Sequence, residues 1–320
     1  MNSSVTLSAL IDFNYDLQID GDVLGSFTEI TIGDQKGVLK VPVFNYSELD
    51  IKEPLSKPLK GPQNAENWKR DKKALFWGRP ISYPTIKAIV NSMLIEFSSI
   101  ELTKYDEVAQ KIYDHYNDWH DLFNMYITLF TRQDLRSKYY QPPSPTSFAI
   151  FRSDEKELVR ITHVNSKDNT ISYAEKGKYL SIEDLKKICH LTSNNINPLM
   201  EWKLFLKALD AQRKSNNRMA IIEAANALEF CLTSRIMEEF KNQSINFGEK
   251  LLQKFRMLGG RFELLRILSI PIPEKNYESL IIKPRNDVVH RAEFPEDSLV
   301  DQVICEVEKI LLFYYPDFHN

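Results

Sequence analysis

The chain has 320 residues, of which 43% are hydrophobic, and its formal net charge is −3. This hydrophobic content is enough for one large core or two smaller ones, which predicts a folded protein. The slight negative charge excludes a strongly basic nucleic-acid coat, but it leaves room for a local basic site.

The cysteines and the N-terminal residues indicate a reducing compartment. Cys189, Cys231 and Cys305 are far apart and form no CxxC pair, so we expect buried thiols and no metal site. The opening MNSSVTLSALIDFNYD lacks the pattern of a secretory leader, and no later run reaches the roughly 18 apolar residues of a membrane span. We therefore expect a cytoplasmic protein with no membrane partner.

The first part of the chain predicts an antiparallel sheet. Residues 5–44 alternate β-favouring runs with turn signals, as in VTLSALIDF, DLQIDGD, SFTEITIGDQKG and VLKVPVF. We expect hairpin corners at Asp20-Gly21 and between Gly33 and Gly37, because glycine adopts positive φ without a steric penalty. The stretch EPLSKPLKGPQNAENWKRDKK that follows has no sustained period and is interpreted as an exposed loop.

A further strand and a long helix are expected next. AIVNSMLIEFSSIEL predicts a strand, and residues 104–130 predict an amphipathic helix that packs on the sheet. The apolar positions of this helix are Val108, Ile112, Tyr116, Trp119 and Phe123. His115 and His120 lie five residues apart on it, so they point to different faces, and we favour a solvated face over a metal site.

Proline-rich YYQPPSPTS, residues 139–147, is an internal break, and SFAIFRS, ELVRITHV and TISYAEKGKYLS predict three more strands. From about residue 181 the pattern is helical almost throughout. The predicted fold class is therefore α+β, with a β-rich N-terminal domain at 1–180 that holds at least one packed helix and an all-α bundle at 181–320.

The C-terminal half predicts a bundle of four or five helices. MAIIEAANALEFCLTSRIMEEF has a helical stripe that includes small alanines, which allow a partner helix to approach closely. GEKLLQKFRMLGGRFELLRIL predicts a helix pair divided at Gly259-Gly260, and PEDSLVDQVICEVEKILLFYY predicts the last helix. The basic residues of the middle segment either form a solvated face or follow an RNA backbone; they are Lys250, Lys254, Arg256, Arg261 and Arg266.

The segment KPRNDVVHRAEF, just before the last helix, carries the candidate site. The spacing of Arg285 and His290 alone is expected by chance about once in a chain of this composition. Pro284 favours a new helical turn in which Val288 and Val289 would anchor the backbone. Asn286 and His290 then share a face, whereas Arg285 must reach across to join them or meet a second subunit.

These residue types suit metal-free cleavage of RNA by its own 2′-hydroxyl. A histidine can move the proton at the attacking or leaving oxygen, and a guanidinium can clamp the phosphate. Asn286 could orient either the imidazole or the ribose. The alternative is a polar pair that ties one helix to the next and has no catalytic role.

At this point residues 199–315 resemble a known family. RNDVVH, the upstream AIIEAANALEF, the intervening LGGRFELL and the closing DSLVDQVICEVEKILL look like the HEPN superfamily, and the β-rich region before them is most similar to the ApeA-type defence proteins. The resemblance implies a dimeric, cofactor-free endoribonuclease of anti-phage or abortive-infection systems, with RNA as substrate and an N-terminal domain that senses the invader.

Carried over by position, the resemblance implies Arg285 and His290 as the catalytic pair and Asn286 as their polar companion. Glu229 of the upstream helix would support the site. The alternative is that Glu229 only caps a helix or carries a surface charge. The same resemblance leaves a second function open, in which an inactive HEPN dimer serves as a nucleotide- or protein-binding scaffold.

Overall fold

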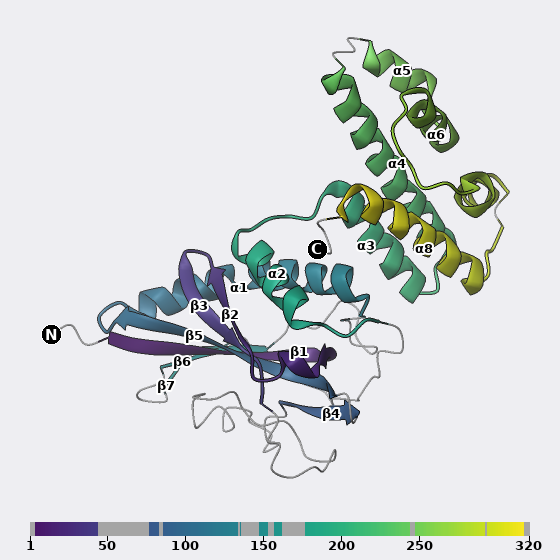
Figure 1. Ribbon diagram of the computed structural model, residues 1–320. Helices are drawn as coiled ribbons and strands as arrows, with labels where there is room; N and C mark the ends of the chain where they lie inside the picture. The colour runs from purple at the N-terminus through teal and green to yellow at the C-terminus, as the bar shows by residue number, and fades with distance from the viewer. Residues whose placement is uncertain are drawn as a thin grey trace. The chain divides into compact units, whose positions relative to one another are not determined.

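The chain folds as two compact units, Met1–Asn197 and Pro198–Asn320. The structure is a computed structural model, and it describes residues 4–43, 77–82, 86–133, 135, 147–152, 157–161, 177–243, 247–291 and 293–316. The fold class is α+β, as the sequence predicts (Figure 1). The predicted loop at 53–73 and most of the predicted break at 139–147 lie outside the described residues.

The described strands of the first unit form a seven-stranded sheet in which all the paired strands are antiparallel. The order is β2-β3-β5-β1-β6-β7, and β4 also pairs with β5. The bounds are β1 Ser4–Asp20, β2 Phe27–Ile32, β3 Gln35–Lys40, β4 Gly78–Ser82, β5 Lys87–Glu101, β6 Ser147–Arg152 and β7 Glu157–Ile161.

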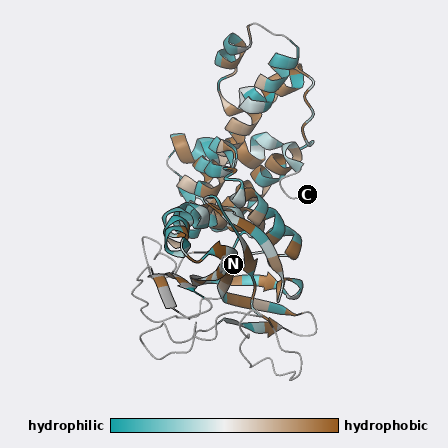
Figure 2. Cartoon of the chain, turned by 90° about the vertical axis from the view of Figure 1, so that its left-hand side faces the viewer, coloured by the Kyte–Doolittle hydropathy of each residue, from teal (hydrophilic) through white to brown (hydrophobic). Residues whose placement is uncertain are grey.

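The two long strands β1 and β5 lie side by side at the centre of the sheet. Leu10 and Ile11 on β1, and Leu94 and Ile95 on β5, are consecutive residues that are fully buried, as expected of strands covered on both faces. The shorter β2 and β3 alternate between buried and exposed positions instead. Figure 2 shows many hydrophobic residues along the strands.

One of the two predicted hairpin corners is present. Gly33 has a φ of 62° and joins β2 to β3, and a side chain there would meet the His115 ring at 2.6 Å. The expected corner at Asp20-Gly21 is wrong, because β1 pairs with β5 and β6 and not with β2. Strand order depends on pairing between distant residues, which a local turn signal does not specify.

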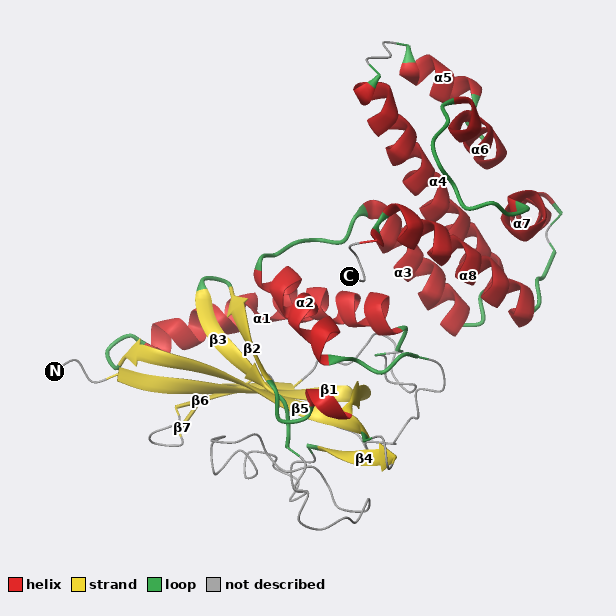
Figure 3. Cartoon of the chain, in the orientation of Figure 1, coloured by secondary structure: helices red, strands yellow, loops and turns green. Residues whose placement is uncertain are grey.

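Two helices, α1 (Tyr105–Thr131) and α2 (Ile182–Ser193), lie on one face of the sheet (Figures 1 and 3). The backbone N–H of Thr31 on β2 donates to the Ser193 hydroxyl at 2.8 Å, and the Tyr126 hydroxyl on α1 donates to the Ile196 carbonyl at 2.8 Å. These contacts attach α2 to the sheet unit, so the division after Asn197 comes later than the boundary expected near residue 180.

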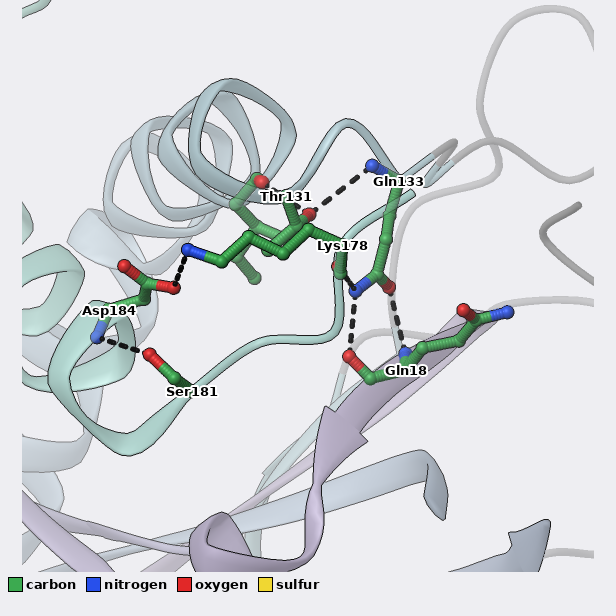
Figure 4. Close-up of polar contacts among 7 residues, drawn as sticks. Gln18, Thr131, Gln133, Lys178, Ser181 and Asp184 are labelled. Atoms are coloured by element: carbon green, nitrogen blue, oxygen red, sulfur yellow. Dashed lines mark hydrogen bonds and ion pairs between the residues drawn. The ribbon is translucent and has the colours of Figure 1, made fainter. Parts of the chain in front are cut away.

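A buried glutamine ties α1 to the chain entering α2. The Gln133 side chain accepts from the Gln18 backbone N–H at 2.8 Å and donates to the Gln18 carbonyl at 2.7 Å and to the Lys178 carbonyl at 3.0 Å (Figure 4). The strand predicted at 170–181 lies mostly outside the described residues. Within the described part, Leu180 forms one isolated bridge to Ile19.

The second unit is entirely helical in its described regular elements. The helices are α3 (Met200–Arg213), α4 (Asn217–Asn242), α5 (Gly248–Lys254), α6 (Leu258–Ile267), α7 (Lys283–His290) and α8 (Asp297–Tyr314). The predicted stripe on α4 is confirmed, since all its members are buried: Ile221, Ala224, Ala225, Leu228, Cys231, Leu232 and Ile236. Helix α4 packs against α3, α6, α7 and α8.

The helix pair α5 and α6 is divided at a different point from the one expected. The break falls at residues 255–257, and Gly259 and Gly260 belong to the first turn of α6. A Cβ on Gly260 would lie 3.0 Å from the Phe255 carbonyl oxygen. The glycine therefore allows the start of α6 to pack closely on the end of α5. None of the helices in the described part of the chain is long and apolar enough to cross a membrane.

Candidate functional site

The motif helix α7 is continuous with a wider turn before it. Residues Glu278–Ile282 form a π-helical turn, and the Lys283 N–H bonds to the Glu278 carbonyl, five residues back. Lys283 is itself α-helical, with φ −62° and ψ −52°. Pro284 lies in the first turn of α7, as the sequence predicts, although the π turn runs directly into that helix. A proline disfavours the helical conformation of the residue before it, but Lys283 is helical here. A π turn relieves the clash that a proline ring makes inside an α-helix.

One side of α7 is fixed in the core. Pro284 is buried and Val288 is 1% exposed, whereas Val289 is 39% exposed. Of the two valines expected to anchor the turn, only Val288 does so. Helix α7 lies against α4 and is seen nearly end-on in Figure 3. The core contacts hold the backbone that carries the polar residues.

Two of the predicted site residues are in direct contact. Arg285 donates from Nη1 to the Asn286 Oδ1 at 3.1 Å, and both side chains are half-buried. His290 is the last residue of α7, and it is exposed. Asn286 and His290 lie four residues apart on the helix and share a face. Asn286 is thus the neighbour that links the guanidinium to the face with the imidazole.

An acidic residue within the motif was not singled out from the sequence. Asp287 forms an ion pair with Arg291 at 3.0 Å, and its side chain is 17% exposed. Its backbone carbonyl accepts from the N–H groups of Arg291 at 3.0 Å and Glu293 at 3.4 Å. These bonds fold the chain after His290 back over the last turn of α7.

A second arginine, Arg218 on the first turn of α4, was also missed. Its Nη2 donates to the Val288 carbonyl at 3.2 Å, close to the end of α7, where carbonyls lack partners within the helix. Its guanidinium lies over the Phe294 ring, 5.6 Å from the centroid. The contact joins residues 70 positions apart, so no local sequence pattern could reveal it.

Glu229 lies elsewhere on α4. Burial lowers the pKa of Arg261 on α6, and the charge of Glu229 opposes that shift. Among the described residues, no hydrogen bond or ion pair joins Glu229 to α7. Arg261 is 8% exposed and donates to the Leu252 carbonyl at 2.9 Å, so its role is structural. The other basic residues singled out in this segment are exposed at the surface: Lys250, Lys254, Arg256 and Arg266.

The two histidines of α1 lie in different environments. His115 is exposed and His120 is buried, and the part of the chain that the structure describes has no group of three or more His, Cys, Asp or Glu residues placed to hold a metal ion. The expectation of a solvated face is wrong for His120. It lies near Asn124, whose Oδ1 accepts from the Tyr15 hydroxyl at 2.6 Å. Burial lowers the pKa of His120 to about 4.

Comparisons of the chain with models of protein families, with curated proteins and with solved structures find no match. The chemistry that α7 could perform is therefore argued from the residues of this helix alone. A half-buried guanidinium can bind a phosphate through paired N–H donors, and an exposed imidazole can accept a hydrogen bond from a bound hydroxyl.

Proposed function

We propose that the helical unit is a metal-independent endoribonuclease that cleaves RNA by attack of the 2′-hydroxyl, with Arg285 and His290 as its catalytic residues. The observation that supports this most is the Arg285 to Asn286 hydrogen bond on an eight-residue helix that ends in the exposed His290. Buried Pro284 and Val288 give these side chains a fixed support.

The proposed reaction needs proton transfer and charge stabilisation. His290 removes the proton of the 2′-hydroxyl, the 2′-oxygen bonds to phosphorus, and the 5′-oxygen leaves as it gains a proton. The products are a 2′,3′-cyclic phosphate and a 5′-hydroxyl end. Arg285 binds the non-bridging phosphate oxygens as negative charge develops on them. Asn286 orients the guanidinium of Arg285. Protonation of the leaving oxygen falls to a second His290 if two chains share one cleft.

The resemblance of residues 199–315 to the HEPN superfamily suggests the biological role of this reaction. It leads us to propose a homodimer formed through the helical unit, acting in the cytoplasm as the effector of a prokaryotic-type abortive-infection or anti-phage system. The sheet unit would then hold the surface that recognises an invader-derived trigger. Cys189 and Cys231 are buried, as expected, whereas Cys305 is exposed. Three free cysteines suit a reducing compartment.

A second candidate function is a non-catalytic HEPN scaffold that binds a nucleotide or a protein partner. The observation that favours it is the internal pairing of the motif's charges, since Arg291 neutralises Asp287 and Asn286 occupies one donor of Arg285. In that case the motif residues would stabilise folding or association without turning over substrate.

Sequencing of RNA ends in cells that express the protein separates the two functions. Induction of the wild type should create new 5′-hydroxyl and cyclic-phosphate ends that are absent after induction of His290→Ala at equal protein level. The same end profile for both proteins would favour the scaffold. The pattern of new ends would also identify the RNA that is cut.

A further inference from the structure

Phe294, four residues after His290, is the large hydrophobic residue with the highest exposure in the described chain. Its exposed fraction is 86%, compared with 58% for Phe247 and 50% for Phe230 in the same unit. A single exposed apolar residue is common and by itself indicates nothing. The surroundings of Phe294 are what give it meaning.

The ring of Phe294 has a charged support on one face. The Arg218 guanidinium lies over it at 5.6 Å, and the same guanidinium donates to the Val288 carbonyl on α7 at 3.2 Å. The Nε of Arg218 is buried and has no hydrogen-bond partner among the described residues. At 86% exposure the ring keeps most of its surface open beside this cation. A single arginine thus connects the end of the motif helix to the ring.

The backbone on both sides of Phe294 is also held. The Glu293 N–H donates to the Asp287 carbonyl at 3.4 Å, which brings the chain back over α7. On the other side, the Asn217 Nδ2 donates to the Pro295 carbonyl at 2.9 Å and to the Asp297 Oδ1 at 2.7 Å. The ring is therefore presented on an anchored segment next to the helix that carries Arg285 and His290.

We propose that Phe294 is a stacking platform for an unpaired nucleobase beside the scissile phosphate, which makes single-stranded RNA the substrate. This inference rests on the proposed ribonuclease function. An exposed aromatic ring on an anchored segment can stack any base, because every base has a π face. Bases inside a duplex are already stacked and are not available to it. The platform therefore selects for strand state, not for sequence.

The alternative occupant of the exposed ring is a second copy of this chain. A contact between copies would also bury an exposed phenylalanine, but it would not depend on whether the RNA carries a base at the stacked position. RNA oligonucleotides that lack one base, with the sugar and phosphate intact, separate the two cases.

The first test measures binding in the inactive His290→Ala background, so that no RNA is consumed. Fluorescence anisotropy would give the Kd of a labelled single-stranded RNA and of a set with one abasic nucleotide at successive positions. Phe294→Ala should weaken binding of the intact strand by about 5- to 100-fold, and Phe294→Trp should restore it. At one abasic position the two proteins should bind equally, because the stacked base is already missing. Phe247→Ala, which removes another exposed phenylalanine of the same unit, should bind like the parent.

The second test measures cleavage in the otherwise unaltered protein. Phe294→Ala should raise KM for single-stranded RNA, leave kcat within about twofold, and reduce the preference for single strands over a matched duplex. Wild-type affinity in Phe294→Ala, or an equal loss with intact and abasic RNA accompanied by dissociation into monomers, would overturn the stacking platform. A wild type that binds RNA with this abasic dependence but does not cut it would instead contradict only the ribonuclease function.

Discussion

Arg285 and Asn286 are joined by a hydrogen bond of 3.1 Å between neighbouring side chains of one helix. Consecutive helical residues point about 100° apart, so the arginine has turned around the helix to reach the amide. The sequence predicts that Arg285 joins the face of Asn286 and His290 by reaching across the helix or that a second subunit completes the site. The hydrogen bond brings its guanidinium to Asn286. Asn286 thereby becomes the residue that sets the direction of the guanidinium.

Substitution of Asn286 should reduce RNA cleavage, and the loss should be larger when the new side chain is negatively charged. Asn286→Ala removes one hydrogen bond to Arg285, and we expect a loss of about tenfold in kcat/KM. Asn286→Asp places a carboxylate against the guanidinium and against the incoming phosphate, so we expect a loss of roughly 100-fold or more. Steady-state cleavage of one labelled RNA measures both. Equal activity of the two variants would show that Asn286 does not orient Arg285.

The two valines of the motif give a matched pair for stability. Val288 is 1% exposed and Val289 is 39% exposed on the same helix. Val288→Ala should lower the free energy of unfolding of the helical unit by about 1–3 kcal/mol, because it leaves a cavity between α7 and its neighbours. Val289→Ala should change it by about 0.5 kcal/mol or less. Denaturant unfolding followed by circular dichroism checks this, and a larger effect of Val289→Ala would mean that α7 is seated differently.

Gln133 should be among the most sensitive polar positions of the sheet unit. Gln133→Leu would leave the Gln18 N–H and the Lys178 carbonyl without the partner shown in Figure 4, at a cost of about 2–4 kcal/mol. Gln110→Ala, on the exposed side of α1, is the control and should be close to neutral. Thermal unfolding of the two variants compares them directly. Equal melting temperatures would contradict a structural role for Gln133.

Stability of the sheet unit should depend on pH through His120. Burial lowers the pKa of this imidazole from 6.5 to about 4. Between these values the unfolded chain binds the proton and the folded chain does not, so folding stability is complete above about pH 6.5 and falls as the pH drops toward 4. The full change is roughly 3 kcal/mol.

His120→Gln should remove this component of the pH dependence, whatever its effect on stability at pH 7. Unfolding free energies of the wild type and the variant at several pH values between 4 and 7 measure the difference in slope. Parallel curves would show that His120 is accessible to protons in the folded state.

Local patterns predicted the long helix α1, the strand β5 and the helices α4 and α8, but not the short strand β4 or the continuity of β1 from Ser4 to Asp20. The stripe on α4 follows from helical periodicity, and the strand β5 follows from a run of β-favouring residues. On α1, the same rule assigned His120 to the solvent although it is buried, because an imidazole is compatible with either environment. The corner at Asp20-Gly21 was misassigned because the partners of β1 come from residues 87–101 and 147–152.

The candidate site was predictable in its residues and not in its surroundings. Arg285, Asn286 and His290 follow from a short motif on one helix. Arg218 reaches this helix from a position 70 residues earlier. The π turn Glu278–Ile282 lies before the motif, where helical periodicity does not distinguish it from an α-helical turn. Helix spacing also left the direction of Arg285 open, which the Asn286 contact now defines.

The most direct test of the account is RNA cleavage by purified full-length protein in EDTA, with analysis of the product ends. We expect cleavage that leaves 2′,3′-cyclic phosphate and 5′-hydroxyl ends, and a loss of roughly 100-fold or more in both Arg285→Ala and His290→Ala. The Phe247→Ala variant should cut at the wild-type rate. Undiminished cleavage in the two motif variants, or activity that disappears in EDTA, would contradict the proposed metal-independent ribonuclease.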